Sequence, residues 1–395
     1  MWRWDPPAAN LSLSDALVLR LRAQAQRLTE STRRMSTPAA ILRDICGLQA
    51  QLMSAARLGL RVRSAGLSAG SVTRALNQER SIVRTWLMRG TLHVVAAEDL
   101  GWLLSLLGPQ FAAGSKTRHA QLGLDRDLKL RGVDTIRRIL ADAGPLTRYD
   151  LVDRLRRRGI RLDPKSQAPI HLIRLAALQG VLCFGPDQEN GEPTYVLIDD
   201  WARQPSSSRA SALGELARRY FAAYGPATVE DLASWSGLPL SQTRSAVALA
   251  RPGLAEVTIR GQPGFLSKGR PPRSRPPARA NPDVRLLPAF DTYLLGYRNR
   301  ELMVPQTSLR RRLQRGGGWL HPAVIVDGRA IAAWRLAGAG RKPEVLLEPF
   351  EKLSGAVHAG IEAEAGDLGR FLALPLQIKI GEPAAWPAPR SSRCQ

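Results

Sequence analysis

The sequence predicts an α+β chain with three tandem winged-helix units and a small β-barrel-like C-terminal domain. An eight-residue pattern occurs at 144–151 and again at 225–232, each time after an amphipathic helix and before two strand-like segments. A third set of helices with a hairpin lies nearer the N-terminus. We therefore expect units at 1–130, 131–205 and 206–268.

In the first unit, Ser14, Thr37 and Ser71 stand where helix N-caps are expected. Their helices should reach about residues 27, 46 and 77, and a helix rich in Leu and Trp should cover 98–107. Residues 58–63 alternate apolar and basic, which indicates an extended segment with Arg61 and Arg63 on one face. Those arginines lie either in solvent or on phosphate.

A hairpin is expected at 82–95, with Arg89 and Gly90 as a two-residue loop. In that register Trp86 lies opposite His93. A bulged loop would shift the register, because Arg is not ideal in such a turn. With the helices before it, the hairpin makes a DNA-docking winged helix with a basic tip. The Trp86–His93 pair is equally consistent with a purely structural role.

The repeated pattern opens with Gly-Pro and supplies a helix-capping Thr, Thr147 in one copy and Thr228 in the other. A charged connector is expected at 118–131, before the second unit. The expected helices are 133–143, 171–178, 213–224 and 242–249, and the expected strands are 181–184, 195–198, 256–260 and 264–266.

Residues 269–283 are dense in Arg and Pro and predict an extended basic linker, either a solvated tether or a path along phosphates. Beyond it, Asp327-Gly328 marks the turn of a hairpin. A helix at 349–364 and a strand at 371–380 complete the barrel-like domain expected over 284–395.

The net charge of +23 favours polyanionic partners, first nucleic acid and then an anionic membrane surface. Most of the basic residues are Arg, which suits bidentate phosphate contact, although a GC-rich genome would also raise the Arg content. No apolar run is long enough to span a bilayer, and the start of the chain has no signal-peptide core, so we expect a cytoplasmic, nucleoid-associated protein with no membrane partner. The three cysteines and five histidines are dispersed, so no disulfide framework, metal site or cofactor is expected.

Gln49 and Gln51 follow an apolar helical run at a spacing that points both to one side of an extended backbone. An amide is neither an acid nor a base near neutral pH, but it offers an acceptor oxygen and two donor hydrogens. The pair predicts either a polar surface turn or a site that holds one water in a fixed orientation.

Three stretches, in this order, resemble the AlkZ-type (YcaQ-like) tandem winged-helix DNA glycosylases, bacterial proteins that remove alkylated purines. They are Gly-Leu-Gln-Ala-Gln at 47–51, Arg-Thr-Trp-Leu-Met-Arg-Gly-Thr-Leu-His at 84–93, and Leu-Leu-Pro-Ala-Phe-Asp-Thr-Tyr-Leu-Leu-Gly-Tyr-Arg-Asn-Arg at 286–300. The resemblance covers nearly the whole chain. It implies a C-shaped arrangement with an open cleft, a monomer, and duplex DNA with alkylated purines as the partner.

The resemblance makes Gln49 and Gln51 the catalytic pair, and the carboxylate that replaces the second glutamine in some relatives is absent here. Asp291 is either a DNA contact or a structural partner. The candidate DNA contacts, from the matching stretches and the arginines near them, are Arg61, Arg63, Arg84, Trp86, Arg89, Thr91, His93, Asp291, Tyr297, Arg298 and Arg300.

An enzyme of this kind would hydrolyse the N-glycosidic bond of a cationic N7-alkylguanine or N3-alkyladenine, including bulky natural-product adducts or cross-links in a self-resistance role. We expect no lyase activity, since a lyase needs a desolvated lysine and no Lys lies in the three stretches. Two other classes stay open. One is a winged-helix transcriptional regulator, which gives no reason for paired glutamines; the other is an RNA-binding scaffold, for which an aromatic stacking platform is missing.

Overall fold

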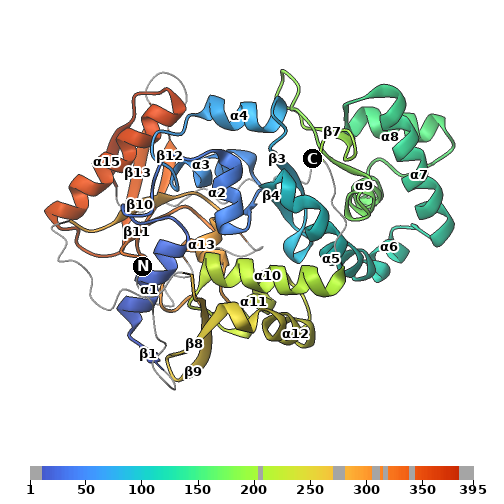
Figure 1. The fold of residues 1–395 in the computed structure, drawn as a ribbon. Helices are drawn as coiled ribbons and strands as arrows, with labels where there is room; N and C mark the ends of the chain where they lie inside the picture. The colour runs from blue at the N-terminus through green and yellow to red at the C-terminus, as the bar shows by residue number, and fades with distance from the viewer. Residues whose placement is uncertain are drawn as a thin grey trace.

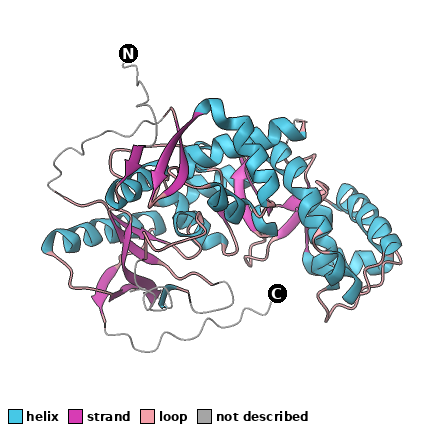
Figure 2. Cartoon of the chain, turned by 90° about the horizontal axis from the view of Figure 1, so that it is seen from below, coloured by secondary structure: helices cyan, strands magenta, loops and turns pink. Residues whose placement is uncertain are grey.

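The computed structural model describes residues 11–202, 208–269, 281–304, 312–314, 319–337 and 343–381. Their strands form three three-stranded sheets and one five-stranded sheet. Figures 1 and 2 show the second unit at one end of the molecule and the five-stranded sheet at the other, with the first unit between them.

The first unit packs short helices beside the sheet β2-β4-β3. Its helices are α2 (Pro38–Ile45), α3 (Met53–Arg61) and α4 (Ala69–Asn77), and its strands are β2 (Leu48–Gln49), β3 (Ile82–Trp86) and β4 (Leu92–Ala96). Thr37 caps α2 as expected. Ser68 rather than Ser71 caps α4, because the Ser68 hydroxyl accepts the Ser71 backbone N–H. After the sheet come η2 (Ala97–Asp99), α5 (Leu100–Ala113) and α6 (Lys116–Gln121).

The second unit repeats this order of helices and strands. It contains α7 (Arg126–Ala143), β5 (Leu146–Thr147), α8 (Arg148–Arg157), α9 (Ala168–Leu178), β6 (Leu182–Phe184) and β7 (Thr194–Leu197), with the sheet order β5-β7-β6. The expected connector at 118–131 is wrong, since α6 and the first turn of α7 occupy most of it. Asp125 caps α7, and the charged side chains of this stretch lie mostly on its exposed side.

The third unit contains α10 (Arg209–Tyr224), α11 (Val229–Ser236), α12 (Leu240–Ala250), η3 (Arg251–Gly253), β8 (Leu254–Ile259) and β9 (Gln262–Ser267). Its sheet also takes in the N-terminal strand β1 (Leu11–Leu13), which pairs in parallel with β8. The helix α1 (Asp15–Ala25), capped by Ser14 as expected, follows β1. The N-terminal residues that the structure describes therefore pack on the third unit as well as on the first unit. Thr147 and Thr228 cap α8 and α11, so both predicted caps are confirmed.

The C-terminal part is a five-stranded sheet covered by one long helix. Its elements are β10 (Val284–Leu287), α13 (Thr292–Leu295), β11 (Ala323–Val326), β12 (Arg329–Ala337), β13 (Glu344–Pro349), α15 (Gly355–Leu372) and β14 (Gln377–Ile380). The strands follow the order β10-β11-β12-β13-β14, with β10 and β14 outermost among the described residues. Asp327 and Gly328 both have positive φ at the β11–β12 turn, as their sequence predicts. The helix begins and ends later than expected, because β13 takes up the residues through Pro349. Most of the expected linker lies outside the described residues.

Two further expectations about the first unit are wrong. Residues 58–61 are the end of a helix and not a strand, because Ala55, Ala56, Gly59 and Leu60 form its buried face. Six alternating residues are too few to distinguish the two periods.

The strand pairing in the hairpin is also shifted by one residue from the pairing that a two-residue loop would give. Trp86 pairs with Leu92, and Thr85 pairs with His93. The connection is the short turn η1 (Met88–Gly90), closed by a hydrogen bond from the Leu87 N–H to the Thr91 carbonyl. A one-residue shift moves every side chain to the other face of a sheet, so His93 and Trp86 lie on opposite faces.

Candidate active site

A row of polar side chains crosses the first unit's sheet. Gln49 in β2 lies opposite His93 in β4, and His93 lies opposite Thr85 in β3. Residues opposite one another share a face of the sheet. All three are buried, with exposed fractions of 9% for Gln49, 1% for His93 and 0% for Thr85. Each of these side chains is neutral or can be neutral, so its burial does not carry the high free-energy cost of burying a charge.

His93 is held as a neutral imidazole. Burial lowers the pKa of His93 to about 3, and the nearby Arg89 guanidinium acts in the same direction. Its Nδ1 lies 3.0 Å from the Thr91 carbonyl oxygen. Because a carbonyl only accepts, Nδ1 carries the proton. His93 is therefore a neutral polar group in this row, and its burial contradicts the predicted DNA contact.

Arg89, at the hairpin tip, joins this row to the third unit. It donates from Nη2 to Gln49 Oε1 and from Nη1 to the Trp235 carbonyl oxygen, each over 2.5 Å. Burial lowers the pKa of Arg89, and the charge of the neighbouring Arg300 adds to that effect. The Gln49 amide is thus oriented by a half-buried cation.

The third unit approaches Arg89 closely through the end of α11. Gly237 ends this helix with a φ of +77°, and a Cβ at that position would lie 2.9 Å from the Arg89 Cα. Only glycine fits such a contact in the left-handed region without strain. The basic tip of the hairpin is therefore packed between units and is not a free DNA-docking wing.

Gln51 differs from Gln49 in its surroundings. It lies in a bend just beyond β2, and its side chain is exposed. The peptide N–H of Ala50, between the two glutamines, donates to the Leu92 carbonyl over 2.7 Å. One amide is therefore held inside the protein, and the other reaches solvent.

The opposite face of the hairpin contacts the second unit. Trp86 is 7% exposed, and its ring centroid lies 5.1 Å from that of Phe184. Trp86 is thus a core residue and not a DNA contact, which corrects the prediction. The Arg84 guanidinium carbon lies 4.5 Å from the centroid of the same Phe184 ring. Thr91 is half-buried, and its hydroxyl donates to the Met88 carbonyl.

Arg61 and Arg63 are fully buried, so the phosphate contacts expected of them are wrong. Arg61 forms ion pairs with Glu364 and Asp367 of α15. Arg63 donates to both carboxylate oxygens of Asp291, over 2.8 and 2.7 Å. Unpaired burial of an arginine is costly, so each is placed where a carboxylate meets it. They join the first unit to the C-terminal part.

Asp291 and Tyr297 are also internal, contrary to the DNA contacts expected of them. Asp291 is 2% exposed, pairs with Arg63 and caps α13, so the structural role that the sequence left open is the observed one. Tyr297 is 1% exposed and donates its hydroxyl to the Tyr224 carbonyl over 2.9 Å. The Arg22 guanidinium lies 3.8 Å over the Tyr297 ring.

Arg298 and Arg300 remain accessible. Arg298 is exposed, and its backbone N–H donates to Asp231. Arg300 is partly buried, which lowers the pKa of its guanidinium, and it donates to the Gln314 amide oxygen over 2.8 Å. Arg298 and Arg89 both contact α11, through Asp231 and the Trp235 carbonyl, so the fold brings the third sequence stretch and the hairpin tip to the same helix.

Comparisons with known proteins show the family to which the chain belongs. The family model described as DNA glycosylase AlkZ-like matches residues 42–371. This chain belongs to the AlkZ-like DNA glycosylase family. It is 29% identical over 342 residues to an interstrand DNA cross-link repair glycosylase of Streptomyces sahachiroi, a match that covers 82% of this chain and 88% of the relative. The solved structure of the Streptomyces sahachiroi DNA glycosylase AlkZ is similar with a TM-score of 0.76 at 26% identity, over 94% of this chain and 100% of that one.

The family match includes the polar row, the hairpin and the 286–300 stretch in one alignment. Among the described helices of this AlkZ-like chain, none is long and apolar enough to cross a membrane.

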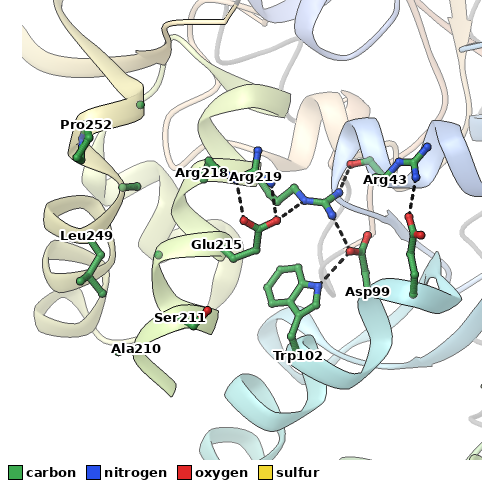
Figure 3. Close-up of a pocket in the computed structure, with 14 residues that line it drawn as sticks. Arg43, Asp99, Trp102, Ala210, Ser211, Glu215, Arg218, Arg219, Leu249 and Pro252 are labelled. Atoms are coloured by element: carbon green, nitrogen blue, oxygen red, sulfur yellow. Dashed lines mark hydrogen bonds and ion pairs between the residues drawn. The ribbon is translucent and has the colours of Figure 1, made fainter. Parts of the chain in front are cut away.

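A hollow of about 910 Å³ lies elsewhere in the AlkZ-like fold, with walls from α2, α5, α10 and α12 (Figure 3). Its charged groups compensate one another. Arg219 binds Asp99 over 2.8 Å and Glu215 over 2.7 Å, and the Trp102 indole N–H donates to Asp99. Because these charges are already paired, we do not place the DNA site of this AlkZ-like protein there.

Sequence reasoning missed two members of the site. Thr85 sits in the hairpin stretch, but the expected register placed it away from His93. Its buried hydroxyl has no hydrogen-bond partner within the described residues. The Trp235 carbonyl is a backbone group, which carries no signal in sequence. Only the packing of α11 against the hairpin tip brings it to Arg89.

Proposed function

We propose that the chain is a monofunctional DNA glycosylase that hydrolyses the N-glycosidic bond of cationic N7-alkylguanine or N3-alkyladenine adducts. The observation that supports this most directly is the chemistry of the gathered groups. Gln49 and Gln51 are neutral amides, His93 is a neutral imidazole, and Arg89 is a cation bound to Gln49. None of these is an acid suited to protonating a departing base near neutral pH.

A purine alkylated at these positions is already cationic and leaves as a neutral molecule. The remaining barrier lies in stabilising the oxocarbenium-like sugar and placing a water. One aligned dipole contributes about 3 kcal/mol in comparable sites. That is sufficient for a bond weakened by alkylation and too little for an unmodified nucleotide, so the chemistry itself selects cationic lesions.

The two glutamines have different tasks in this proposal. The exposed Gln51 amide oxygen orients the attacking water and lays partial negative charge beside the sugar. The Gln49 oxygen already accepts a hydrogen bond from Arg89, so Gln49 contributes chiefly its Nε2 hydrogens and a fixed dipole. Arg89 holds that dipole in place before substrate arrives, which is preorganisation.

The arginines beside the site supply phosphate contacts. Arg89 donates to the neutral oxygens of Gln49 and Trp235, and Arg300 donates to the neutral amide of Gln314, so these partners leave both cations uncompensated. A backbone phosphate would compensate them, and exposed Arg298 would extend the contact. We place duplex DNA on this side, along the concave face of a C-shaped set of winged helices, with the protein acting as a monomer.

The relative from Streptomyces sahachiroi is named for interstrand cross-link repair. We extend the proposal to bulky N7 adducts and cross-links of the same chemistry, including those of DNA-alkylating natural products. A panel of small methyl and bulky intercalating adducts, assayed side by side, measures which are substrates.

The direct test incubates the protein with duplex DNA that carries one N7-alkylguanine and measures release of the modified base. We expect release, and we expect the double variant Gln49→Ala with Gln51→Ala to slow it at least about a hundredfold while duplex affinity stays nearly intact. Gln179→Ala, an exposed glutamine of the second unit, is the matched control. Tight, sequence-selective binding without release of any N7 or N3 adduct would favour the transcriptional regulator instead.

Monofunctional hydrolysis has its own test. Borohydride added during the reaction should trap no protein–DNA adduct, because no lysine forms a Schiff base with the sugar. The product strand should remain intact until alkali cleaves the abasic site. A trapped covalent complex would overturn this part of the proposal alone.

A further inference from the structure

Arg84 contacts the backbone of the segment that carries the two glutamines. Its Nε–H donates to the carbonyl oxygen of Ala50 over 3.2 Å. That carbonyl belongs to the peptide group whose nitrogen is that of Gln51. The peptide group on the other side of Ala50 donates to the Leu92 carbonyl. Each of the two peptide groups between the glutamines is thus fixed by one hydrogen bond. The Gln49–Ala50 peptide donates to Leu92 of β4, and the Ala50–Gln51 peptide accepts from Arg84.

The second unit holds the Arg84 side chain in turn. Its guanidinium lies over the ring of Phe184 at the end of β6, and Phe184 is itself buried between Trp86 and Tyr195. A cation is attracted to the face of an aromatic ring, and a planar guanidinium stacks there as an ammonium group does not. Arg84 therefore links the position of the second unit to the backbone beside Gln51.

We propose that Arg84 is a positioning residue for Gln51, which orients the Ala50–Gln51 peptide with Phe184 as its support. The exposed Gln51 side chain takes its direction from this peptide. A displacement of about 1 Å at a reacting group costs about a hundredfold in rate. The catalytic consequence rests on the proposed glycosylase function, while the support of the segment by Arg84 does not.

Arg80 offers a matched control at the start of the same hairpin. Its guanidinium lies 4.5 Å over the Trp201 ring, and it donates to the Asp200 carbonyl over 2.7 Å. It thus makes the same two kinds of contact, with an aromatic ring and with a backbone carbonyl, but both partners belong to the second unit and lie away from the glutamines. Lysine keeps the charge at either position and removes the Nε–H and the planar stacking group.

The first measurement is hydrogen–deuterium exchange of the full-length protein over residues 48–53, which does not depend on catalysis. We expect Arg84→Lys and Phe184→Leu to speed exchange there and Arg80→Lys to leave it unchanged. Unchanged exchange in Arg84→Lys would overturn the proposal. Thermal unfolding of each variant shows whether it is folded. If Phe184→Leu does not fold, the more conservative Arg84→Lys alone decides the test.

The second measurement is single-turnover base release together with duplex affinity across a range of salt concentrations. We expect Arg84→Lys to slow release by roughly ten- to a hundredfold, with the affinity and its salt dependence unchanged. Weaker affinity with a shallower salt dependence would make Arg84 a phosphate contact. Unaltered base release would show that Gln51 needs no support from Arg84. Either result overturns the proposal. If the wild-type protein releases no base, the proposed function fails, and the exchange measurement still decides the role of Arg84 in the segment.

Discussion

Gln49 and Gln51 look equivalent in sequence, but their different surroundings mean that they contribute differently to the stability of the fold. Truncating Gln49 leaves the Arg89 Nη2 hydrogen without its acceptor in a half-buried position. We expect Gln49→Ala to lower the free energy of unfolding by about 1–3 kcal/mol and Gln51→Ala to change it by less than about 0.5 kcal/mol. Urea denaturation of both variants measures this, and equal losses would contradict the asymmetry.

A carboxylate in place of Gln51 tests the sign of its electrostatic contribution. If the amide oxygen lies beside developing positive charge, Glu keeps an acceptor there and adds negative charge. We expect Gln51→Glu to retain base release within about tenfold of wild type, whereas Gln51→Ala loses about a hundredfold. Single-turnover release from an N7-methylguanine duplex compares them. A Glu variant as slow as the Ala variant would show that the donor hydrogens of the amide are what matters.

The buried His93 should make the protein less stable in mild acid. Its pKa is about 6.5 when unfolded and about 3 when folded, so between these values the unfolded chain binds a proton that the folded protein does not. This contribution to stability is present above pH 6.5 and is lost progressively as the pH falls toward 3. At pH 5 the loss amounts to about 2 kcal/mol.

Substitution of His93 by Gln isolates that contribution from other titrating groups. We expect the drop in unfolding free energy between pH 7.5 and pH 5 to be smaller in His93→Gln than in wild type by about 2 kcal/mol. Chemical denaturation at the two pH values gives both drops. Equal drops would mean that His93 is not held neutral in the folded protein.

At the scale of single elements, short-range chemistry decides where helices begin. In α11 the Thr228 hydroxyl accepts the Asp231 N–H over 3.1 Å, and Asp231 accepts the Thr228 N–H over 3.0 Å. This reciprocal pair is a capping box. Because α11 also presents the Trp235 carbonyl to Arg89, its cap supports the candidate site indirectly.

We expect Thr228→Ala to lower the free energy of unfolding by about 1 kcal/mol, since it leaves a helix-terminal N–H without a partner. Thr135→Ala is the control, because Thr135 lies partly buried inside α7, where its hydroxyl donates to the Arg131 carbonyl and caps no helix. Thermal unfolding compares the two. A Thr135 variant that loses as much would show that the cap is not the cause.

At the scale of the whole molecule, buried ion pairs hold the C-terminal part to the first unit. Arg63 and Asp291 are both fully enclosed. We expect Arg63→Met alone to cost about 3–5 kcal/mol, because it leaves the Asp291 carboxylate buried without its cation. The double variant with Asp291→Leu should recover much of that loss.

The exposed pair Arg158–Asp142 provides the comparison, since its contribution is screened by water. Arg158→Ala should cost less than about 1 kcal/mol. Denaturant midpoints of the three variants test both statements. If Arg63→Met were as mild as Arg158→Ala, the pair would not be what joins the two parts.

Much of the secondary structure followed from sequence because its causes are local. The Thr37, Thr147 and Thr228 caps, the Asp327-Gly328 turn and the repeated Gly-Pro-x-Thr pattern each act within a few residues. The polar pair Gln49 and Gln51 and the family resemblance were readable for the same reason, as short strings with a fixed order. The one-residue hairpin shift was not, since Arg89 at the tip has a positive φ of 56° and packs against Gly237 of another unit, which no short string records.

What the sequence by itself determined is the order of elements, the family and the identity of the two amides. What only the tertiary structure decided is which charged and polar side chains lie at the surface and which are internal. Arg61, Arg63, Asp291 and Tyr297 look like surface contacts along the chain, yet partners more than seventy residues away enclose them. The physical reason is that burial of a charge is settled by whether a distant opposite charge arrives to pair with it, and no local pattern records that.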